Sequence, residues 1–346
     1  MSVRFFDPRR AYEAQRDELD EAFRRVMSSD RIVLGPEVEA FERELAELTA
    51  THHAVGVASG TDALELALRA LELPAGAEVL CPDLTSPATP TGIVRAGLRP
   101  VLVDVEPDTL TIDVARAAEA VSEQTAAVVA VHLYGRPAPV DELLSLGLPV
   151  VEDAAQAHGL VIDGRPAGSI GSAGCFSFYP TKNLAAFGDG GAVVTSDPGL
   201  AEAVRELRSY GEQPRYFARR EGTNSRLDEL QAALLRVRLR RLEQDNRRRA
   251  EIAAAYDQAL GRASPDGVHH LYVLRSARRD ALRSELADAG IQTAVHYPWA
   301  ISEQQAFADA RRGAVVASTA SAREVLSLPC YAHLTKAEQE QVVAAL

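Results

Sequence analysis

The sequence predicts an α/β protein with a mostly parallel central sheet that is covered by helices on both faces. Through residue 153, short apolar segments typical of strands alternate with amphipathic segments typical of helices. Strands that are apolar along their whole length indicate a parallel sheet, because such sheets are buried on both faces. The chain has 346 residues, more than one compact core usually holds, so we also expect a smaller second domain.

The predicted elements follow in order along the chain. Two amphipathic helices are expected first, near 9–27 and 36–51, and Gly35-Pro36 opens the second. Strands are then predicted at 54–58, 78–82, 100–105, 126–134 and 148–153, with helices between them at 62–73, 89–97, 113–121 and 139–146. Ligands of such sheets bind beyond the carboxyl ends of the strands, so that is where we expect a site.

After residue 170 the alternation changes. Two strands at 173–180 and 190–197 are followed by a helix at 198–209. Asn224-Ser225 is expected to cap a long helix towards Leu260, with Ser225 and Asp228 at capping-box spacing. A strand at 269–275, a helix at 279–289, a strand at 291–297 and two more helices complete the chain. We place the boundary inside the long helix, which gives a large domain, 1–245, and a small α/β domain, 246–346.

Composition excludes several classes of protein. The net charge of -12 provides no general basic field for nucleic acid. The arginine-rich segment 236–249 carries Leu and Val at helical spacing, which favours a solvated helix face over a nucleic-acid patch. No apolar segment approaches the roughly 18 residues that span a bilayer, and no signal-peptide core is present. Three widely separated cysteines suit a reducing compartment and no zinc site. We therefore expect a cytoplasmic protein that binds no metal.

One lysine stands out. Among 37 basic residues only Lys182 and Lys336 are lysines. Arginine keeps its proton near neutral pH, whereas lysine can become a nucleophile. The start of an exposed helix explains Lys336, but Lys182 lies in an apolar, glycine-rich segment. Lys182 is therefore a candidate for chemistry, with chance retention as the alternative.

Two further features occur where predicted strands end. Ser59, Gly60 and Thr61 follow a strand and open a helix, so their N–H groups and hydroxyls could hold a phosphate. The alternative is an ordinary helix cap. Asp153 ends another strand, and a buried carboxylate requires a partner such as a ring cation, a metal or a ribose. No cluster of His or Cys at ligand spacing accompanies it, which disfavours a metal.

The segment 175–194, CFSFYPTKNLAAFGDGGAVV, contains Ser177 and Lys182, which could reach one ligand. Its glycines 188, 190 and 191 either let backbone approach something flat or form a hairpin turn. Taken together, a phosphate cradle, an anion and a lysine match the needs of pyridoxal phosphate. That cofactor forms an imine, or Schiff base, with lysine, and its protonated ring withdraws electrons from a carbanion.

Nearly the whole chain resembles the DegT-type (StrS-like) sugar aminotransferases. The matching segments are VLGPEVEAFERELA, ASGTDALELAL, VVEDAAQAHG, FSFYPTKNLAAFGDGGAVVT, NSRLDELQAALLRVRLRRL, VHYP and LSLPCY. The resemblance implies the type I fold of pyridoxal-phosphate enzymes, like aspartate aminotransferase. It also implies transfer of an amino group from L-glutamate to a keto sugar, usually nucleotide-linked, through pyridoxamine phosphate. FSFYPTKNLAAFGDGG is most similar to members that aminate dTDP-3-keto-6-deoxyhexoses in antibiotic pathways.

The resemblance also implies roles for single residues. Lys182 would form the imine and move the proton, Asp153 would bind the pyridinium nitrogen, and Gln156 would contact the ring hydroxyl. The phosphate would be held by Ser59, Gly60, Thr61 and Ser177, and by Asn224 of a neighbouring subunit, which implies a homodimer with shared sites. The loop 210–222, with Tyr216, would cover the partner's site, and the HYP segment, with His296 and Tyr297, would face the substrate.

Three departures from the family pattern affect these expectations. Ser86 stands where the family usually has an aromatic residue stacked on the cofactor, and HYPWAISEQQ lacks the family's following histidine and places Trp299 there. The chain is also somewhat short after residue 300. Two alternatives stay open, namely a keto-cyclitol acceptor and a non-catalytic regulatory homologue that binds the cofactor. Dehydrating members, which replace the lysine by histidine, are disfavoured by Lys182.

Overall fold

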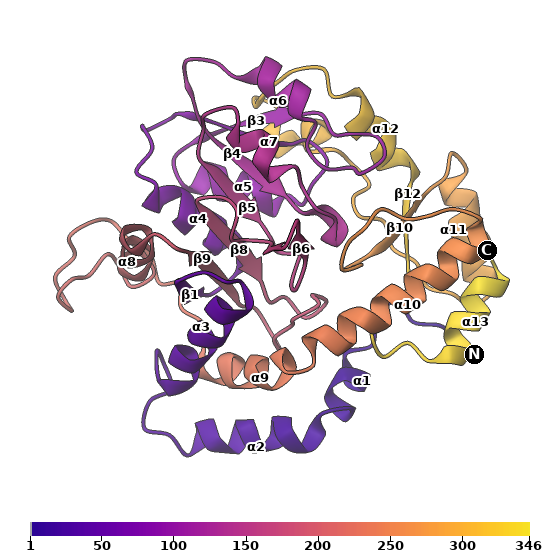
Figure 1. Ribbon diagram of the computed structural model, residues 1–346, viewed down its shortest axis with the longest axis horizontal. Coiled ribbons are helices and arrows are strands. Elements are labelled where there is room, and N and C mark those ends of the chain that lie inside the picture. The colour runs from indigo at the N-terminus through magenta and orange to yellow at the C-terminus, as the bar shows by residue number, and fades with distance from the viewer. Residues whose placement is uncertain (1) are drawn as a thin grey trace.

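The computed structural model describes residues 2–346, and an eight-stranded sheet forms its centre (Figure 1). The strand order is β1-β9-β8-β5-β4-β2-β3-β11. Their bounds are β1 His53–Val57, β2 Glu78–Pro82, β3 Arg99–Val103, β4 Thr125–Val131, β5 Val150–Asp153, β8 Ala173–Ser177, β9 Gly191–Thr195 and β11 Arg311–Arg312. Only β9 runs antiparallel to its neighbours, so the prediction of a mostly parallel sheet is confirmed.

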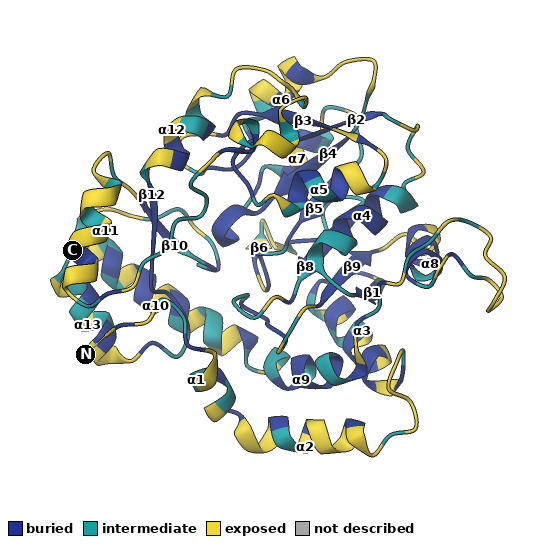
Figure 2. Cartoon of the chain, turned by 180° about the vertical axis from the view of Figure 1, so that it is seen from behind, coloured by how far each residue is buried: buried dark blue, intermediate teal, exposed yellow. Residues whose placement is uncertain are grey.

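Helices cover both faces of this sheet. On one face, apolar side chains of α4 (Gly60–Ala70), α5 (Ala88–Arg95) and α8 (Pro198–Leu207) pack on alternate strand residues such as Val79 and Cys81. On the other face, α6 (Val114–Ala120) and α7 (Val140–Leu144) pack on Leu80 and its neighbours. There, α3 (Pro36–Leu48) and α9 (Glu229–Leu239) cover the β1 end. The strands between them are almost entirely buried (Figure 2).

Two predicted long helices are each interrupted. The N-terminal one is α1 (Pro8–Glu13) and α2 (Arg16–Met27), and the helix expected towards Leu260 is α9 followed by α10 (Leu242–Leu260). The predicted cap is wrong because Ser225 serves another element. Its hydroxyl accepts a hydrogen bond from Ala58 N–H at 3.0 Å and donates to Asp62 at 2.8 Å, and Asp228 makes no side-chain cap bond.

The C-terminal residues build a small unit around a two-stranded sheet. β10 (Tyr272–Arg275) pairs antiparallel with β12 (Val325–Leu328), beside α10, α11 (Arg279–Asp288) and α13 (Lys336–Ala344). The predicted strand at 291–297 is wrong, because its two halves meet different partners. Ile291 bridges Val3, and Ala294 bridges Ser327.

The segment around residues 301–324 returns to the large sheet, which the sequence did not indicate. It contains η2 (Ile301–Glu303), η3 (Gln305–Phe307), β11 beside β3, and α12 (Val316–Glu324). Two carboxylates at strand ends hold it, since Asp83 accepts from Ser302 N–H at 2.7 Å and Asp104 accepts from Ser318 N–H at 2.7 Å. Residue 245 therefore stays a proposed division between the two domains. The short elements η1 (Leu133–Gly135), β6 (Val161–Ile162) and β7 (Arg165–Pro166) complete the fold.

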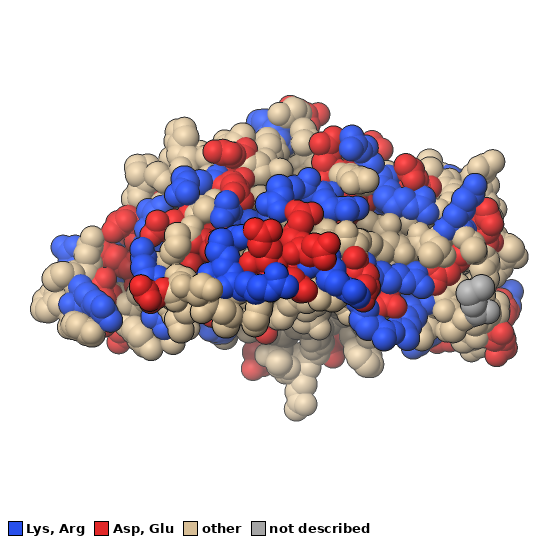
Figure 3. Space-filling model, turned by 90° about the horizontal axis from the view of Figure 1, so that it is seen from below, with Lys and Arg blue, Asp and Glu red and all other residues tan. Residues whose placement is uncertain are grey.

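Four of the seven arginines in the segment 236–249 are paired with carboxylates. Blue and red side chains alternate on the face seen in Figure 3. The ion pairs are Arg236 with Glu37 and Glu44, Arg240 with Glu18, Arg247 with Glu243, and Arg248 with Glu251. These pairs lie on a helix surface, but Arg249 is buried and donates to the carbonyls of His270 and Cys330, so the predicted solvated face holds only for part of the segment. Within residues 2–346, no helix is long and apolar enough to cross a bilayer.

Candidate active site

A cavity of about 350 Å³ opens at the carboxyl ends of the parallel strands. Most of the predicted site residues line it: Ser59, Gly60, Thr61, Asp153, Gln156, Ser177, Lys182, His296 and Tyr297. They come from segments far apart in the chain, and the sheet brings them together because β5 and β8 are neighbours and α4 packs across them. The cavity therefore lies where doubly covered sheets place their ligands.

The start of α4 forms a cradle for an anion. Ser59 is the N-cap of this helix, and its hydroxyl accepts from Asp62 N–H at 3.1 Å, so the capping interpretation is confirmed. A Cβ on Gly60 would lie 2.6 Å from Cβ of Ser177, so only glycine lets Ser177 approach the helix start. Thr61 adds its hydroxyl to the same wall. These residues fit a phosphate group, whose charge the N-terminus of a helix stabilises.

The glycine-rich loop serves protein packing more than ligand contact. A Cβ on Gly191 would lie 2.3 Å from the carbonyl oxygen of Ser59, and a Cβ on Gly190 would lie 3.0 Å from Leu227. The glycines therefore let β9 and its loop approach α4 and Leu227. The predicted hairpin turn at 188–191 is wrong, since β8 and β9 are joined by a long loop that carries Lys182.

Asp153 ends β5 at the floor of the cavity. One carboxylate oxygen accepts from the Thr89 hydroxyl at 2.8 Å and the other from Ala155 N–H at 3.2 Å. Thr85 in turn donates to Thr89 at 3.0 Å. Burial raises the pKa of Asp153 above its ordinary value, while the Thr89 hydroxyl, the Ala155 N–H and the charge of Lys182 oppose that shift. Such a carboxylate can hold a cation in the cavity.

Lys182 faces the same cavity from the loop after β8. Burial lowers the pKa of its amine to about 8, and the negative charge of Asp153 opposes this shift. Both side chains line the cavity, and no direct ion pair joins them among the described residues. A larger share of the amine is therefore unprotonated near neutral pH than for an ordinary lysine, which suits attack on an aldehyde.

The residue after Lys182 anchors this loop. The Asn183 amide donates to Asn246 at 2.8 Å and to the Val268 carbonyl at 3.0 Å, and its oxygen lies 3.2 Å from Nδ1 of His270. These contacts fix the backbone of the loop that carries Lys182.

Gln156 is oriented by the backbone of the loop after β4. Its Oε1 accepts from Tyr134 N–H at 2.6 Å, and its Nε2 donates to the Tyr297 hydroxyl at 3.3 Å. The Tyr297 hydroxyl also interacts with Ser86. Gln156 thus presents a donor towards the cavity, which suits an oxygen of a ligand ring.

Two predicted residues lie outside this cavity. Asn224 is exposed and bridges Ser209, and Tyr216 is 81% exposed in the loop 210–222. Trp299 is also exposed and does not line the cavity. The sequence-based analysis missed Thr85, Thr89, Phe5 and His270. The segment CPDLTSPAT after a strand could have indicated the threonines, whereas Phe5 and His270 reach the cavity only through tertiary packing.

Neither a metal-binding cluster nor a disulfide occurs in the part of the chain described. No group of three or more His, Cys, Asp or Glu side chains among residues 2–346 could hold a metal ion. Cys81, Cys175 and Cys330 are all free and buried. The cavity therefore combines an anion cradle, a buried carboxylate and one amine, which is the set that pyridoxal phosphate requires.

Comparison with known proteins assigns the chain to a family. Residues 13–346 match the model of the DegT/DnrJ/EryC1/StrS aminotransferase family, and the chain belongs to this family. The protein is thus an aminotransferase, and its cofactor is pyridoxal 5′-phosphate with pyridoxamine phosphate as its aminated form. The predicted type I fold is confirmed by the solved relatives.

Two relatives and one structure illustrate the similarity. The chain is 46% identical to a dTDP-3-amino-3,4,6-trideoxy-alpha-D-glucose transaminase of Streptomyces venezuelae, over 99% of this chain and 95% of the relative. It is 45% identical to the erythromycin biosynthesis sensory transduction protein EryC1 of Saccharopolyspora erythraea, over 100% and 99%. The crystal structure of S. venezuelae DesV in complex with a ketimine intermediate superposes with a TM-score of 0.96, at 46% identity, over 99% of this chain and 97% of that chain.

Proposed function

We propose that the protein moves an amino group from L-glutamate to carbon 3 of a dTDP-linked keto-deoxyhexose in the biosynthesis of an antibiotic amino sugar. The observation that carries this proposal is that the Lys182 amine, the Asp153 carboxylate and the α4 cradle all line one cavity. The similarity to a dTDP-amino-sugar transaminase supports the choice of acceptor.

The residues that line the cavity have different roles in the reaction, and Lys182 has more than one. When bound, pyridoxal phosphate supplies an electron sink for the bond that breaks at the amino-bearing carbon. Ser59, Gly60, Thr61 and Ser177 hold the phosphate, and Gln156 Nε2 donates to the ring oxygen. The carboxylate of Asp153 keeps the ring nitrogen protonated by its negative charge. The Lys182 amine would hold the cofactor at its aldehyde carbon, with loss of water, and as a free amine it would take the proton from the α-carbon of glutamate. With the acceptor, Lys182 returns a proton to the sugar carbon that receives nitrogen.

We further propose a cytoplasmic homodimer with shared sites. Asn224 and Tyr216 lie outside the cavity of their own subunit, and Tyr210 and Phe217 expose apolar surface on the same loop. An exposed apolar loop suits a contact with a second subunit, in which Asn224 would reach the partner's phosphate cradle. The free, buried cysteines suit a reducing compartment.

The test separates the two half-reactions. The yellow holoenzyme, mixed with L-glutamate, is expected to lose its visible absorbance and release 2-oxoglutarate. Added dTDP-3-keto-6-deoxyhexose is expected to restore the absorbance and yield a dTDP-amino sugar by mass spectrometry. Lys182→Ala should show neither the colour nor turnover, with Lys336→Ala as the matched control. Amination of a keto-cyclitol in place of the sugar would contradict the proposed acceptor.

A regulatory function is the second candidate, because one relative is described as a sensory transduction protein and another, 38% identical, as a pleiotropic regulatory protein. The intact set of Lys182, Asp153 and the cradle favours catalysis. A protein that binds the cofactor but releases no 2-oxoglutarate from glutamate would support the regulatory alternative.

A further inference from the structure

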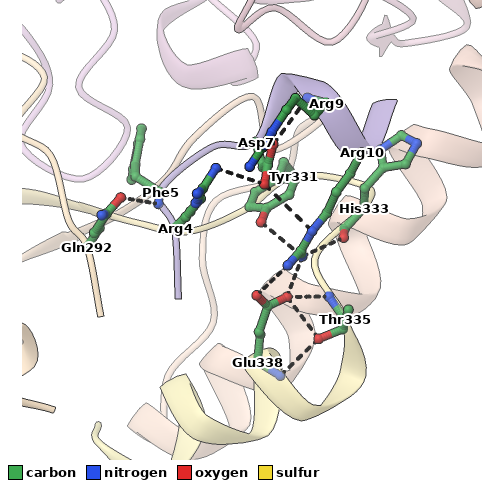
Figure 4. A network of polar contacts seen from close by, with 10 residues as sticks. All are labelled: Arg4, Phe5, Asp7, Arg9, Arg10, Gln292, Tyr331, His333, Thr335 and Glu338. Atoms are coloured by element: carbon green, nitrogen blue, oxygen red, sulfur yellow. Dashed lines mark hydrogen bonds and ion pairs between the residues drawn. The ribbon is translucent and has the colours of Figure 1, made fainter. Parts of the chain in front are cut away.

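The N-terminal segment 3–7 lies along the C-terminal unit and leads Phe5 to the catalytic cavity. Val3 is fully buried in the core of that unit. Its N–H donates to the Gly290 carbonyl at 2.8 Å, and Gln292 N–H donates to the Val3 carbonyl at 2.9 Å. Phe5 N–H donates to the Gln292 side chain at 3.3 Å (Figure 4). The segment is thus held by backbone pairing at Val3 and by a bond from the Phe5 backbone to a side chain.

An ion pair, which we call the Arg10–Glu338 clamp, holds the helix α1 that follows this segment. Arg10 of α1 donates to both oxygens of Glu338, at 2.6 and 2.8 Å, and also to the His333 carbonyl at 3.3 Å (Figure 4). Glu338 also closes the capping box at the start of α13 with Thr335. Two-point contact between arginine and a carboxylate is strong and directional. The Arg10–Glu338 clamp therefore fixes α1, and with it the segment before it, on α13.

Phe5 stacks on a histidine that lines the same cavity. The ring centroids of Phe5 and His296 are 5.7 Å apart and the rings are inclined by 28°. A hydrogen bond also fixes the His296 ring, because its Nδ1 lies 2.9 Å from the Ser327 hydroxyl. Nε2 has no hydrogen-bond partner among the residues described, and it is therefore available to a ligand.

The His296 ring is neutral at physiological pH. Burial, helped by the charge of Lys182, lowers its pKa to about 4. A neutral imidazole exchanges one hydrogen bond with a hydroxyl and adds no charge. A keto sugar carries hydroxyls beside its carbonyl, whereas glutamate carries an ammonium group and two carboxylates. A neutral ring therefore matches the acceptor better than it matches the donor.

We propose that Phe5 is a positioning residue that sets acceptor recognition, by holding His296 with its free nitrogen towards a hydroxyl of the acceptor sugar. The Arg10–Glu338 clamp keeps Phe5 in place from outside the cavity. This inference rests on the proposed function, since it concerns the second half-reaction of the same site. The N-terminal segment is thus part of the specificity apparatus, although it carries no group that reacts.

Substitutions of Phe5 in the holoenzyme test the stack. Phe5→Leu removes the ring, and Phe5→Tyr keeps it. The Phe5→Leu enzyme is expected to raise the KM for the keto-sugar nucleotide about 2- to 10-fold, the range that a ring contact corresponds to. Its kcat and its glutamate half-reaction, followed by absorbance, should stay within about twofold of wild type, and Phe5→Tyr should restore the acceptor KM. Equal effects on both half-reactions, or an unchanged acceptor KM, would overturn the proposal.

Substitution of the clamp tests the same inference from a distance. Arg10→Gln should speed hydrogen exchange in residues 2–7 and raise the acceptor KM without changing the glutamate half-reaction. The matched control is Arg16→Gln, which removes the surface ion pair with Glu13 and touches no part of the segment. Faster exchange with an unchanged acceptor KM would contradict the role of the segment.

Assays of the wild-type enzyme with both acceptors distinguish a failure of this inference from a failure of the proposed function. If wild type aminates a keto-cyclitol and not the sugar nucleotide, the proposed acceptor is wrong, and the comparison of Phe5→Leu with wild type is made on the cyclitol. If wild type aminates neither, both proposals are wrong.

Discussion

At the scale of single residues, the environment of Lys182 determines when the protein can capture its cofactor. Because its pKa is lowered to about 8, the Lys182 amine is mostly unprotonated above pH 8, and the unprotonated fraction decreases below that pH. We expect the rate of imine formation between the apoprotein and pyridoxal phosphate to rise with pH to a midpoint near 8. Stopped-flow absorbance measures this rate.

The effect of Asp153 on the pKa of Lys182 provides a second test of this prediction. The negative charge of Asp153 raises the pKa of Lys182, so Asp153→Asn should move the midpoint to lower pH. Lys336→Arg is the control and should leave the profile unchanged. A wild-type midpoint near 10.4, the value of free lysine, would show that the amine is not desolvated.

The hydrogen bond from Thr89 should matter for cofactor affinity. Thr89→Val keeps the shape of the side chain but removes the donor to the Asp153 carboxylate. The Thr89 hydroxyl opposes the burial that raises the pKa of Asp153, so its loss should leave less of the carboxylate charged, and pyridoxal phosphate should bind the apoprotein more weakly. Fluorescence titration measures this, and Thr91→Val in the same helix is the control. Equal loss of affinity in both variants would point to a disturbed helix instead.

At the scale of elements, the close approach of α4 to β8 creates the phosphate cradle. Gly60→Ala would place a methyl group 2.6 Å from Ser177, so the strand and the helix must separate. We expect weaker binding of pyridoxal phosphate, with little effect on the reaction of Lys182 with pyridoxal, which lacks the phosphate. The apoprotein is titrated with both aldehydes.

Gly313→Ala is the matched control for this prediction, because a Cβ there meets no atom within 4 Å. A Gly60→Ala protein that loses affinity for pyridoxal and its phosphate in the same proportion would argue against a cradle at α4.

The elements also show why local signals can mislead. Ser225 has the sequence context of a helix cap, but its hydroxyl joins β1 to α4 through Ala58 and Asp62. Glu229 is the first residue of α9, but its carboxylate accepts from the N–H groups of Gly35 and Val38 at 3.0 and 2.7 Å and so caps α3. Both groups satisfy buried donors of distant segments, and a sequence does not reveal which distant donor needs an acceptor.

At the scale of the whole molecule, the proposed dimer predicts complementation between inactive subunits. Lys182→Ala removes the amine from its own site, whereas Asn224→Ala would damage the partner's phosphate cradle. A mixed dimer would then contain one site with both native residues. Mixing the two variants, after mild dissociation and reassociation, is therefore expected to recover activity towards one quarter of wild type, assuming random pairing.

The mixed sample is assayed by glutamate-dependent release of 2-oxoglutarate, with each variant alone as the control. Absence of recovery in a sample that mass spectrometry shows to be mixed would contradict shared sites. A monomer in solution would contradict the dimer itself.

The sequence by itself determined the mostly parallel sheet through β9, the order of those strands along the chain, and the residue types that a pyridoxal-phosphate site needs. Apolar strands and polar strand ends are local patterns. The sequence alone also reveals a rare lysine, an aspartate at a strand end and a Ser-Gly-Thr that opens a helix. These features follow from the hydrophobic period and from the chemistry of each side chain. They were sufficient to predict pyridoxal phosphate.

Only the tertiary structure decided which distant segments meet at that site. Phe5 and His270 line the cavity because an N-terminal segment and the segment before β10 converge there, and Thr89 of α5 reaches the Asp153 carboxylate. Tertiary packing also brings segment 301–324 to the large sheet, where its N–H groups donate to the buried carboxylates Asp83 and Asp104 at strand ends. Contacts of this kind depend on the packing of surfaces across hundreds of residues, and local periodicity carries no information about them.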